Sequence, residues 1–478
     1  MTIRKSASNV TLVLGLVLGS FAQAKVSPEE ARQIGLDGTP LTPLGAIRAG
    51  NEDGSIPAWE GGIKQPPASY EVGKWYVDPY ADDEVLFTIT AQNYLQYEDK
   101  LSHGTIAMLK SYPDSFKLNI YQSRRSASYP QEILENSVWN ASHTEFCQPP
   151  RGPNREERCV LRSVYRPGIA FPIPKTGGEA MWNHNYYYSG KYYTAKAYGF
   201  NAFEDGTYAE FRANETWLFP VMMDLDEVPK NEMFARRGGA TWCFAQETTS
   251  PPRSAGSIFG GCTYFETSDF DAYIYVPGQR RVRKAPELGF YDSPGVGSDG
   301  LRTADQRNMF FMTGDEEWYQ WSPPVRKEMF IPYNSYRLAR PGLTLDDIVR
   351  PGHVNSDHKR YELHRVWVIE GNLKPGFRHL GPRRVVYVDE DSWAGSLADM
   401  YDAQGTLWRA SESYLLNFYD VPMVHWWGED HSDLISKRHT GSSSYYNAGG
   451  NESDLPNFHV MPDPEIMTPA GLRRFGVR

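Results

Sequence analysis

Alternating apolar and polar side chains constrain this chain more than any other feature. In residues 207–219 (TYAEFRANETWLF), Phe211, Trp217 and Phe219 fall on one face, and charged or amide side chains fall on the other. The preceding Asp205-Gly206 is a dipeptide typical of hairpin turns. A period of two indicates a strand with one buried face, so the fold must be organised around a sheet.

The same alternation predicts further strands and leaves room only for short helices. Strands are expected at 182–188, 270–276, 329–333, 362–370, 383–389 and 397–421. The last of these contains a hairpin loop at 402–405. Helices are expected after Ser27, at 83–110, at 301–311 and at 344–350. The predicted fold class is α+β and β-rich: a large, strongly curved antiparallel sheet with a few helices against it and long irregular loops.

The first 24 residues have the pattern of a secretory signal peptide. Arg4 and Lys5 form a basic start, Val10 to Leu18 is apolar, and Ala22-Gln23-Ala24 is a small-residue cleavage site. The apolar stretch is shorter than the roughly 20 residues that span a bilayer. We therefore expect cleavage after Ala24 and a periplasmic protein, either free or peripheral at the outer membrane, with no transmembrane segment in the mature chain.

Composition divides the mature chain and excludes one class of partner. Helices and Pro/Gly-rich loops are expected in 25–175, the curved sheet domain in 176–440 and an irregular tail in 441–478. The 478 residues include 49 basic and 59 acidic side chains, a net charge of −10. Binding to nucleic acid needs a basic face for phosphates, so no nucleic-acid partner is expected.

Four cysteines are consistent with export. An even number behind a signal peptide favours disulfides in an oxidising compartment. Three pairings are open. We expect Cys147–Cys159 and Cys243–Cys262, because each closes a short loop rich in Pro or Gly. No C-x-x-C spacing supports a metal site built from them.

Polar clusters offer candidates for metal binding or catalysis, but none has a specific pattern. One group is His353, His358 and His364, and a second is His425, Glu429, Asp430, His431 and Asp433. Neither has H-E-x-x-H spacing, so both are expected to be solvated surface groups. The acidic runs 315–317 and 389–391 are expected to be strand ends or solvated turns rather than calcium loops.

Nucleotide and catalytic motifs are similarly unsupported. The G-x-G-x-x-G at 295–300 follows a proline rather than a strand, so a loop is expected there. The nucleophile elbow G-x-S-x-G is absent from the sequence. We predict no catalytic residue, no metal and no cofactor.

One basic run stands out in this acidic chain. Residues 280–284 (RRVRK) follow a turn, and on a strand Arg281 and Arg283 share a face opposite Val282. Two interpretations remain open. The run is either a salt-bridged strand over an acidic surface or a contact for an anionic head group or an acidic partner protein.

Several long segments resemble the exported bacterial proteins of the domain of unknown function 1329 family. They are spread through most of the mature chain, at 41–62, 112–130, 168–185, 275–294, 326–338, 361–379 and 383–412. That family is similar to the LolA/LolB lipoprotein-carrier superfamily. The resemblance implies an open half-barrel sheet, closed on its concave side by helices around an apolar cavity for acyl chains. It carries over no catalytic residue.

The resemblance predicts a periplasmic carrier for a lipid or another hydrophobic molecule. Its expected partners are an efflux-type inner-membrane transporter and an outer-membrane companion protein. The alternation predicts the residues that face the cavity: Trp182, Tyr186, Phe211, Trp217, Ile274, Trp367 and Trp408. Arg281 and Arg283 are expected to meet the head group or the partner. The alternatives are a non-catalytic docking protein at the outer membrane and an enzyme acting on a lipid or envelope polymer.

Overall fold

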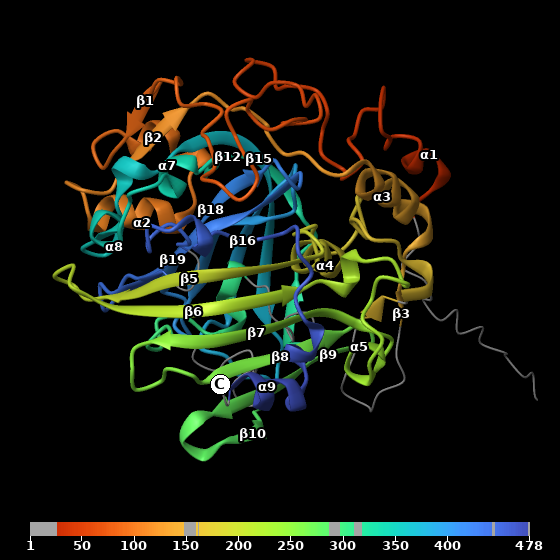
Figure 1. The fold of residues 1–478 in the computed structure, drawn as a ribbon. Helices are drawn as coiled ribbons and strands as arrows, with labels where there is room; N and C mark the ends of the chain where they lie inside the picture. Colours follow the sequence, from red (N-terminus) through yellow and green to blue (C-terminus); the bar gives the residue numbers. More distant parts are fainter. Residues whose placement is uncertain are drawn as a thin grey trace, which may run out of the picture.

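Antiparallel hairpins build most of one large, open sheet (Figure 1). The structure is a computed structural model that describes residues 26–147, 159–160, 162–285, 297–309, 318–441 and 445–476. Sixteen strands from these residues join in one sheet whose two ends do not pair with each other. The predicted β-rich, curved sheet of the α+β class is therefore confirmed. The predicted signal peptide lies outside the described residues.

The N-terminal half-sheet consists of six antiparallel strands. They are β5 (Tyr192–Ala202), β6 (Tyr208–Leu218), β7 (Ala240–Ser250), β8 (Ile258–Tyr264), β9 (Thr267–Val276) and β10 (Arg281–Lys284). The predicted hairpin lies between β5 and β6, where Gly206 adopts a φ of +85°. Along β6, Phe211 and Trp217 are buried while Arg212 and Asn214 are exposed, which confirms the predicted alternation.

The C-terminal half-sheet consists of seven strands, and most of their residues are buried on both faces. They are β11 (Tyr319–Trp321), β12 (Val325–Pro332), β15 (Tyr361–Leu373), β16 (Arg383–Asp389), β17 (Gly395–Tyr401), β18 (Leu407–Phe418) and β19 (Met423–Asp433). The predicted strands at 329–333, 362–370, 383–389 and 397–421 are all found here. The hairpin loop at 402–405 joins β17 to β18, as expected.

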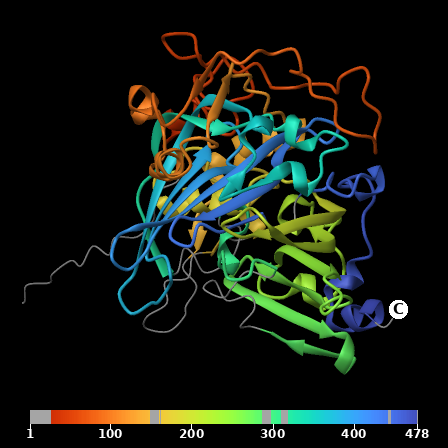
Figure 2. The same cartoon turned by 90° about the vertical axis from the view of Figure 1, so that its left-hand side faces the viewer.

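Two joins complete the sheet. The short strand β20 (His439–Gly441) pairs with β19 on one side and with β5 on the other. Strand β2 (Leu118–Tyr121), with β1 (Phe87–Ile89) beside it, pairs with β15 in parallel. The strands of the two half-sheets run in clearly different directions in Figures 1 and 2, so the sheet bends strongly at β20. Two small pairs stand apart from it: β3 (Phe146–Cys147) with β4 (Cys159–Val160), and β13 (Val349–Arg350) with β14 (His353–Val354).

The helices in the described residues are short. They are α1 (Pro28–Ala31), α2 (His103–Ser111), α3 (Gln131–His143), α4 (Gly177–Asn185), α5 (Glu232–Ala235), α7 (Tyr336–Ala339), α8 (Leu345–Ile348) and α9 (Pro469–Gly476). The capping boxes at Ser27 and Thr344 begin α1 and α8 as predicted. Among the described helices, none combines the length and the apolar character needed to cross a membrane.

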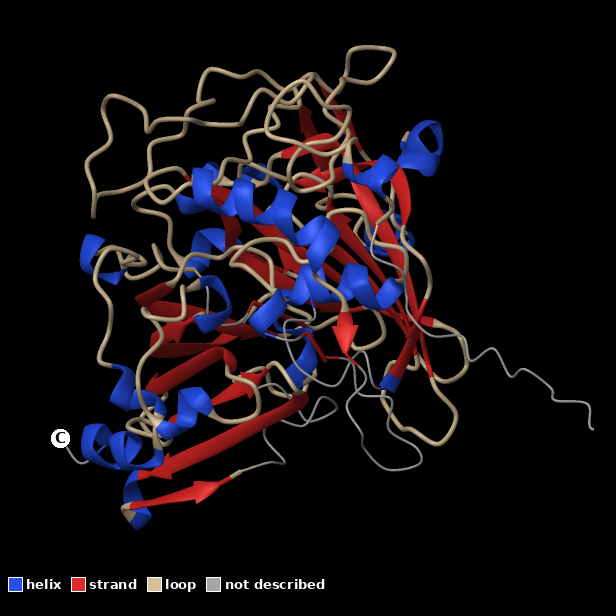
Figure 3. Cartoon of the chain, turned by 90° about the vertical axis from the view of Figure 1, so that its right-hand side faces the viewer, coloured by secondary structure: helices blue, strands red, loops and turns tan. Residues whose placement is uncertain are grey.

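Helix α4 lies inside the curve of the sheet, and all nine of its residues are buried. Its Trp182 ring lies 6.3 Å from the ring of Phe265, which follows β8. On its other side, the ring nitrogen Nδ1 of His184 lies 3.1 Å from the carbonyl oxygen of Trp393, in the loop after β16. Figure 3 shows helices between the two groups of strands. The main core accordingly combines side chains from both half-sheets and α4.

Two predicted elements are wrong in type or extent. Residues 182–185 of the strand expected at 182–188 are the second half of α4, which a capping box of Thr176 and Glu179 begins. A helix buried on all sides has no polar face, so its sequence lacks the usual helical periodicity. The helix expected at 83–110 is divided into β1, a 3₁₀ helix at Tyr94–Lys100 and α2. Ser102 caps α2 and separates the last two. The helix expected at 301–311 is a 3₁₀ segment, Ala304–Met309.

Candidate functional site

An aromatic cluster covers the inner face of the N-terminal half-sheet. It consists of six rings that are at most 8% exposed: Trp217, Phe219, Trp242, Phe244, Phe259 and Phe270. The centroid of Phe244 lies 4.9 Å from that of Trp217, 5.3 Å from that of Phe259 and 5.6 Å from that of Phe270. Alternate residues on four neighbouring strands therefore form a continuous apolar surface.

One polar pair interrupts this surface. Glu215 lies on the buried face of β6, on the same side as Trp217, and is 1% exposed. Its Oε1 accepts a hydrogen bond of 2.8 Å from the side-chain amide of Gln246, and its Oε2 accepts one of 3.3 Å from the Trp217 indole. An apolar surface with a few fixed polar groups is typical of sites for small hydrophobic ligands.

The seven predicted cavity residues do not form one group. Trp217 belongs to the aromatic cluster, and Trp182 and Tyr186 pack with ring centroids 4.4 Å apart at α4. Trp367 lies in the C-terminal half-sheet, where its ring stacks on Trp393 at 5.5 Å. These four contact the main core.

The remaining three predicted residues lie elsewhere. Phe211 is buried towards the start of β6, next to Gly297. Ile274 is half-buried on β9, opposite Arg283 of β10. Trp408 is half-buried on β18 and donates a hydrogen bond of 2.9 Å to Asp433. Their role at a ligand cavity stays a prediction.

The basic run forms the outermost strand of the N-terminal half-sheet. Arg281 and Arg283 are exposed on β10, while Val282 between them is half-buried against the core beneath α9. Lys284 lies 3.3 Å from Asp271. Neither Arg281 nor Arg283 forms an ion pair with any described residue. Their exposure is compatible with a docking surface and does not distinguish a head group from a protein.

One of the two predicted disulfides is confirmed. Cys243 and Cys262 occupy opposite positions of β7 and β8 and are bonded to each other. Cys147 and Cys159 are opposite each other in the backbone register of β3 and β4. Their side chains lie outside the described residues, so that pairing stays a prediction.

A buried charged centre lies where β16 ends beside β15. It consists of Glu362 and His364 of β15 together with Asp389 and Asp391, all at most 6% exposed. His364 Nε2 lies 3.1 Å from Glu362 Oε2, and His364 Nδ1 lies 3.7 Å from Asp389 Oδ1. The ring of Tyr333 stacks on the imidazole with centroids 4.0 Å apart. His364 thus lies between two carboxylates.

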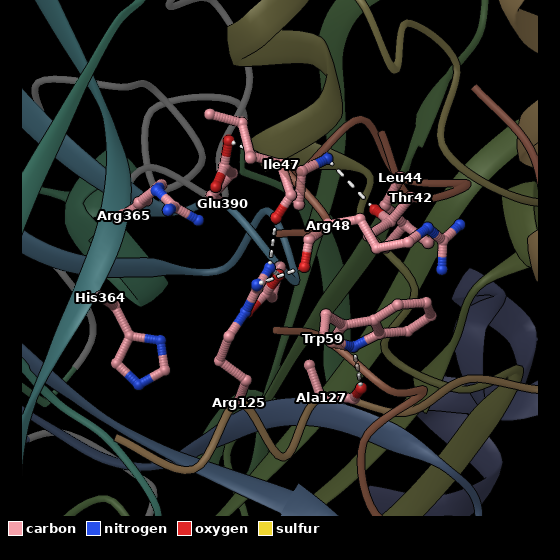
Figure 4. A network of polar contacts seen from close by, with 12 residues as sticks. Thr42, Leu44, Ile47, Arg48, Trp59, Arg125, Ala127, His364, Arg365 and Glu390 are labelled. Carbon is pink, nitrogen blue, oxygen red and sulfur yellow. Dashed lines mark hydrogen bonds and ion pairs between the residues drawn. The ribbon is translucent and has the colours of Figure 1, made fainter. Parts of the chain in front are cut away.

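Arg125 connects this centre to the N-terminal segment. Its guanidinium binds Asp391 through two hydrogen bonds, of 2.6 and 2.9 Å. It also donates to the main-chain oxygens of Ile47, Arg48 and Pro57 at 2.9–3.2 Å. Figure 4 shows the guanidinium pointing at the first two of these oxygens. Five donated hydrogen bonds are the full capacity of a guanidinium, so the side chain fixes residues 47–57 onto the centre.

Burial and neighbouring charges shift the pKa values of this centre in opposite directions. Burial and the nearby charge of Asp391 raise the pKa of Asp389 well above its usual range. Burial also disfavours the charge of Asp391, but Arg125 outweighs it and lowers the pKa of that carboxyl. Burial opposes a charge on His364, yet the hydrogen bond to Glu362 and the surrounding carboxylates raise its pKa. The centre therefore attracts positive charge.

A second polar cluster lies beneath α2. Ser411 of β18 and His431 of β19 are opposite each other, with Oγ and Nδ1 2.8 Å apart. The other nitrogen of His431 is 3.6 Å from a Glu429 oxygen. A hydroxyl, an imidazole and a carboxylate in this order resemble an activated nucleophile. Ser411 also lines a small pocket with Asp399 and Glu412, and the pocket's volume of about 10 Å³ is far below the roughly 300–1,000 Å³ of pockets for drug-sized ligands.

Several polar groups expected at the surface are buried. His425, Glu429, Asp430, His431 and Asp433 all lie on β19 and are at most 7% exposed. His353 and His364 are 1% exposed, while His358 is half-buried. Asp389 does end a strand, as predicted, but residues 389–391 are buried rather than solvated. The predicted solvent exposure was wrong because the N-terminal segment and α2 cover a face of the C-terminal half-sheet, and the local sequence does not indicate this cover. The acidic run 315–317 and residues 295–296 lie outside the described residues. Residues 297–300 form turns, as expected of a loop.

A model of the family described as "Protein of unknown function (DUF1329)" matches residues 88–473. This chain belongs to the DUF1329 family. The predicted resemblance is thereby confirmed. The chain is also 38% identical over 476 residues to the "Uncharacterized protein PA3922" of Pseudomonas aeruginosa, and the match covers 98% of each chain.

Three solved structures are similar to this family member in part, each over 62% of its length. A DUF1329 family protein from Desulfovibrio piger shares 13% identity, with 97% of that chain covered and a TM-score of 0.40. A putative outer membrane lipoprotein-sorting protein domain from Vibrio parahaemolyticus shares 12%, with 98% covered and a TM-score of 0.39. A LolA superfamily protein from Nitrosomonas europaea shares 11%, with 98% covered and a TM-score of 0.34.

Proposed function

We propose that this chain is a periplasmic carrier for a lipid or another hydrophobic molecule. The observation that supports the proposal is the aromatic cluster of β6–β9. These rings face the interior of the curved sheet rather than a second sheet stacked on β6–β9. Shielding an acyl chain from water is worth about 0.8 kcal/mol per CH₂ group. An apolar surface of six rings offers that shielding.

The ligand would lie between the aromatic cluster and α4. The ring of Trp182 on α4 lies 6.3 Å from the ring of Phe265, so α4 borders this side of the interior. Glu215 and Gln246 would meet a polar group of the ligand, because they are the hydrogen-bonding pair on the same face. Loading then requires α4 to move or the two half-sheets to separate.

The narrow join at β20 supports such a movement. Its three residues pair with only two residues of β19 and three of β5. Within the described chain, this join carries all the strand pairing between the two half-sheets. A ligand that favours the open arrangement would shift the equilibrium towards it.

The partners belong to the same proposal. An efflux-type inner-membrane transporter and an outer-membrane companion would exchange the ligand with the carrier. The exposed Arg281 and Arg283 on β10 provide a positively charged contact for an acidic partner surface. Replacing both with Ala should weaken partner binding and leave ligand binding unchanged. If partner binding is also unchanged, their docking role is wrong.

Native mass spectrometry of the gently purified protein, followed by organic extraction, tests carriage directly. We expect a stoichiometric lipid-like mass on the wild type. Phe244→Ser should reduce bound ligand, because it places a hydroxyl at the middle of the aromatic cluster. Trp139→Ala is the matched control, since this half-buried ring stacks on His143 of α3, away from the interior. A clean unliganded mass that persists after incubation with envelope lipids would overturn the carrier.

A further inference from the structure

The three side chains His364, Asp389 and Asp391 are arranged like a set of metal ligands. One nitrogen or oxygen of each lies within 4.8 Å of the corresponding atoms of the other two. All three side chains are at most 6% exposed. His364 lies on β15, Asp389 ends β16 and Asp391 follows in the turn after it. Because Asp389 pairs with Val366 of β15, the strand pairing brings the two segments together.

Of four buried carboxylates in and beside the charged centre, three pair with an arginine and one does not. Asp391 pairs with Arg125 at 2.6 Å. Glu362 pairs with Arg360 at 2.6 Å, and Glu390 pairs with Arg326 at 2.5 Å. Asp389 has no such partner in the described chain. Its nearest basic group is His364, at 3.7 Å.

One oxygen of Asp389 also lacks a hydrogen bond. Its Oδ2 accepts hydrogen bonds from Ser392 Oγ at 2.5 Å and from Tyr333 at 3.2 Å. Its Oδ1 is buried, accepts no hydrogen bond from any described residue and faces His364 Nδ1. A buried carboxylate oxygen with no donor is costly. Because the residue is completely buried, bulk water does not supply the missing partner.

His364 is oriented to present Nδ1 as a ligand. Glu362 Oε2 lies 3.1 Å from Nε2, so in the neutral imidazole with its proton on Nε2 the lone pair of Nδ1 is available to a metal. A carboxylate behind the imidazole is the usual support of a metal-ligating histidine. One imidazole and two carboxylates suit Zn²⁺ and related divalent transition metals better than Ca²⁺ or Mg²⁺, which take oxygen ligands.

We propose that His364 Nδ1, Asp389 Oδ1 and Asp391 bind one divalent transition-metal ion, for which Zn²⁺ is the probe. The ion supplies the positive charge that Asp389 lacks. It ties β15 to the loop after β16, and through Arg125 it stabilises the attachment of residues 47–57. Because the ligands are buried, the ion is structural. This inference does not depend on the carrier proposal.

Zinc titration of the metal-stripped chain, followed by calorimetry and elemental analysis, tests the site. We expect one Zn²⁺ per chain. Asp389→Asn and His364→Gln should each weaken binding by more than the roughly 10–100-fold that loss of an outer partner costs. The matched control is Asp399→Asn, an equally buried carboxyl of β17 that is outside the three ligands. Unchanged affinity in both ligand variants, or no binding by the wild type, would overturn the site and leave an internal His364–Asp389 ion pair.

A second measurement avoids variants that fail to fold. Crystals of the wild type grown with Zn²⁺ should show an anomalous peak at the zinc edge between His364 and Asp389. A peak only at other residues, or no peak, would contradict the proposal. Neither outcome bears on ligand carriage, so this test and that of the carrier can fail separately.

Discussion

The two half-sheets differ in the charged groups that they bury. The N-terminal half-sheet buries six packed aromatic rings on its inner face and leaves part of the outer face of β6, including Arg212 and Asn214, in solvent. The C-terminal half-sheet is covered on both faces and buries ion pairs such as Arg125–Asp391 and Arg360–Glu362. One chain therefore combines an apolar interior, suited to a ligand, with a charged scaffold that holds the N-terminal segment.

Removing a charge from the scaffold should have the largest effect. Arg125→Met leaves Asp391 buried without its partner and releases three main-chain oxygens, so we expect a loss of about 3–5 kcal/mol in the free energy of unfolding. The matched control is Arg212→Met in the N-terminal half-sheet, whose exposed pair with Glu210 should contribute about 0–1 kcal/mol. Urea unfolding measures both. Equal losses would remove the contrast between the half-sheets.

The disulfide tests the N-terminal half-sheet separately. Cys243 and Cys262 are 19 residues apart, and a loop of that size restricts the unfolded chain by about 3 kcal/mol. The double variant Cys243→Ala/Cys262→Ala should lose on the order of this amount. Hydrogen exchange should show the loss mainly in β7–β9, and equal loosening of β15–β19 would contradict the idea that the half-sheets are stabilised separately.

Asp399 should make the C-terminal half-sheet sensitive to pH. Burial raises the pKa of its carboxyl from about 3.8 to about 6, despite hydrogen bonds from Gly104 and Tyr387. The folded state therefore keeps the proton after the unfolded state has lost it. The stabilisation is complete below pH 4 and is lost as the pH rises towards 6.

Asp399→Asn resembles the protonated form and should not show this loss. Relative to the wild type, the variant should gain on the order of 2–3 kcal/mol between pH 4 and pH 7. Thermal unfolding at several pH values measures the difference. A constant difference between the two proteins across this range would show that Asp399 does not titrate as inferred.

The smallest effect is expected at β10. Arg281→Ala/Arg283→Ala removes two exposed side chains that pair with no described residue, so the free energy of unfolding should change by no more than about 0.5 kcal/mol. A larger loss, measured by urea unfolding, would mean that the basic strand stabilises the fold and is not a surface for partners.

How much the sequence revealed also differs between the half-sheets. The alternation around Phe211 and Trp217 and the Asp205-Gly206 turn predicted β6 and its hairpin correctly, because one face of this strand meets water. On β19, the run His425 to Asp433 is buried on both faces, so the polar residues could not indicate exposure. Helix α4 was missed for the same reason.

The charged centre was visible only as separate fragments. His364 and residues 389–391 each drew notice as candidates, but they lie 25 or more positions apart and meet only through the pairing of β15 with β16. Nothing in the sequence around Arg125 predicted its place in the charged centre, since its partner Asp391 is distant in the sequence and its other contacts are main-chain oxygens. Long-range pairing of this kind is set by tertiary structure and not by local pattern.

The position of β20 near the end of the sequence also determines when the complete sheet can form. It joins residues 200–202 to residues 439–441, so the continuous sheet cannot exist until nearly the entire chain is available. Contacts this distant in sequence form slowly, because a long loop must close first. During synthesis from the N-terminus, the N-terminal half-sheet would therefore form first and leave its aromatic cluster uncovered for a time. During that interval it would depend on chaperones to avoid aggregation.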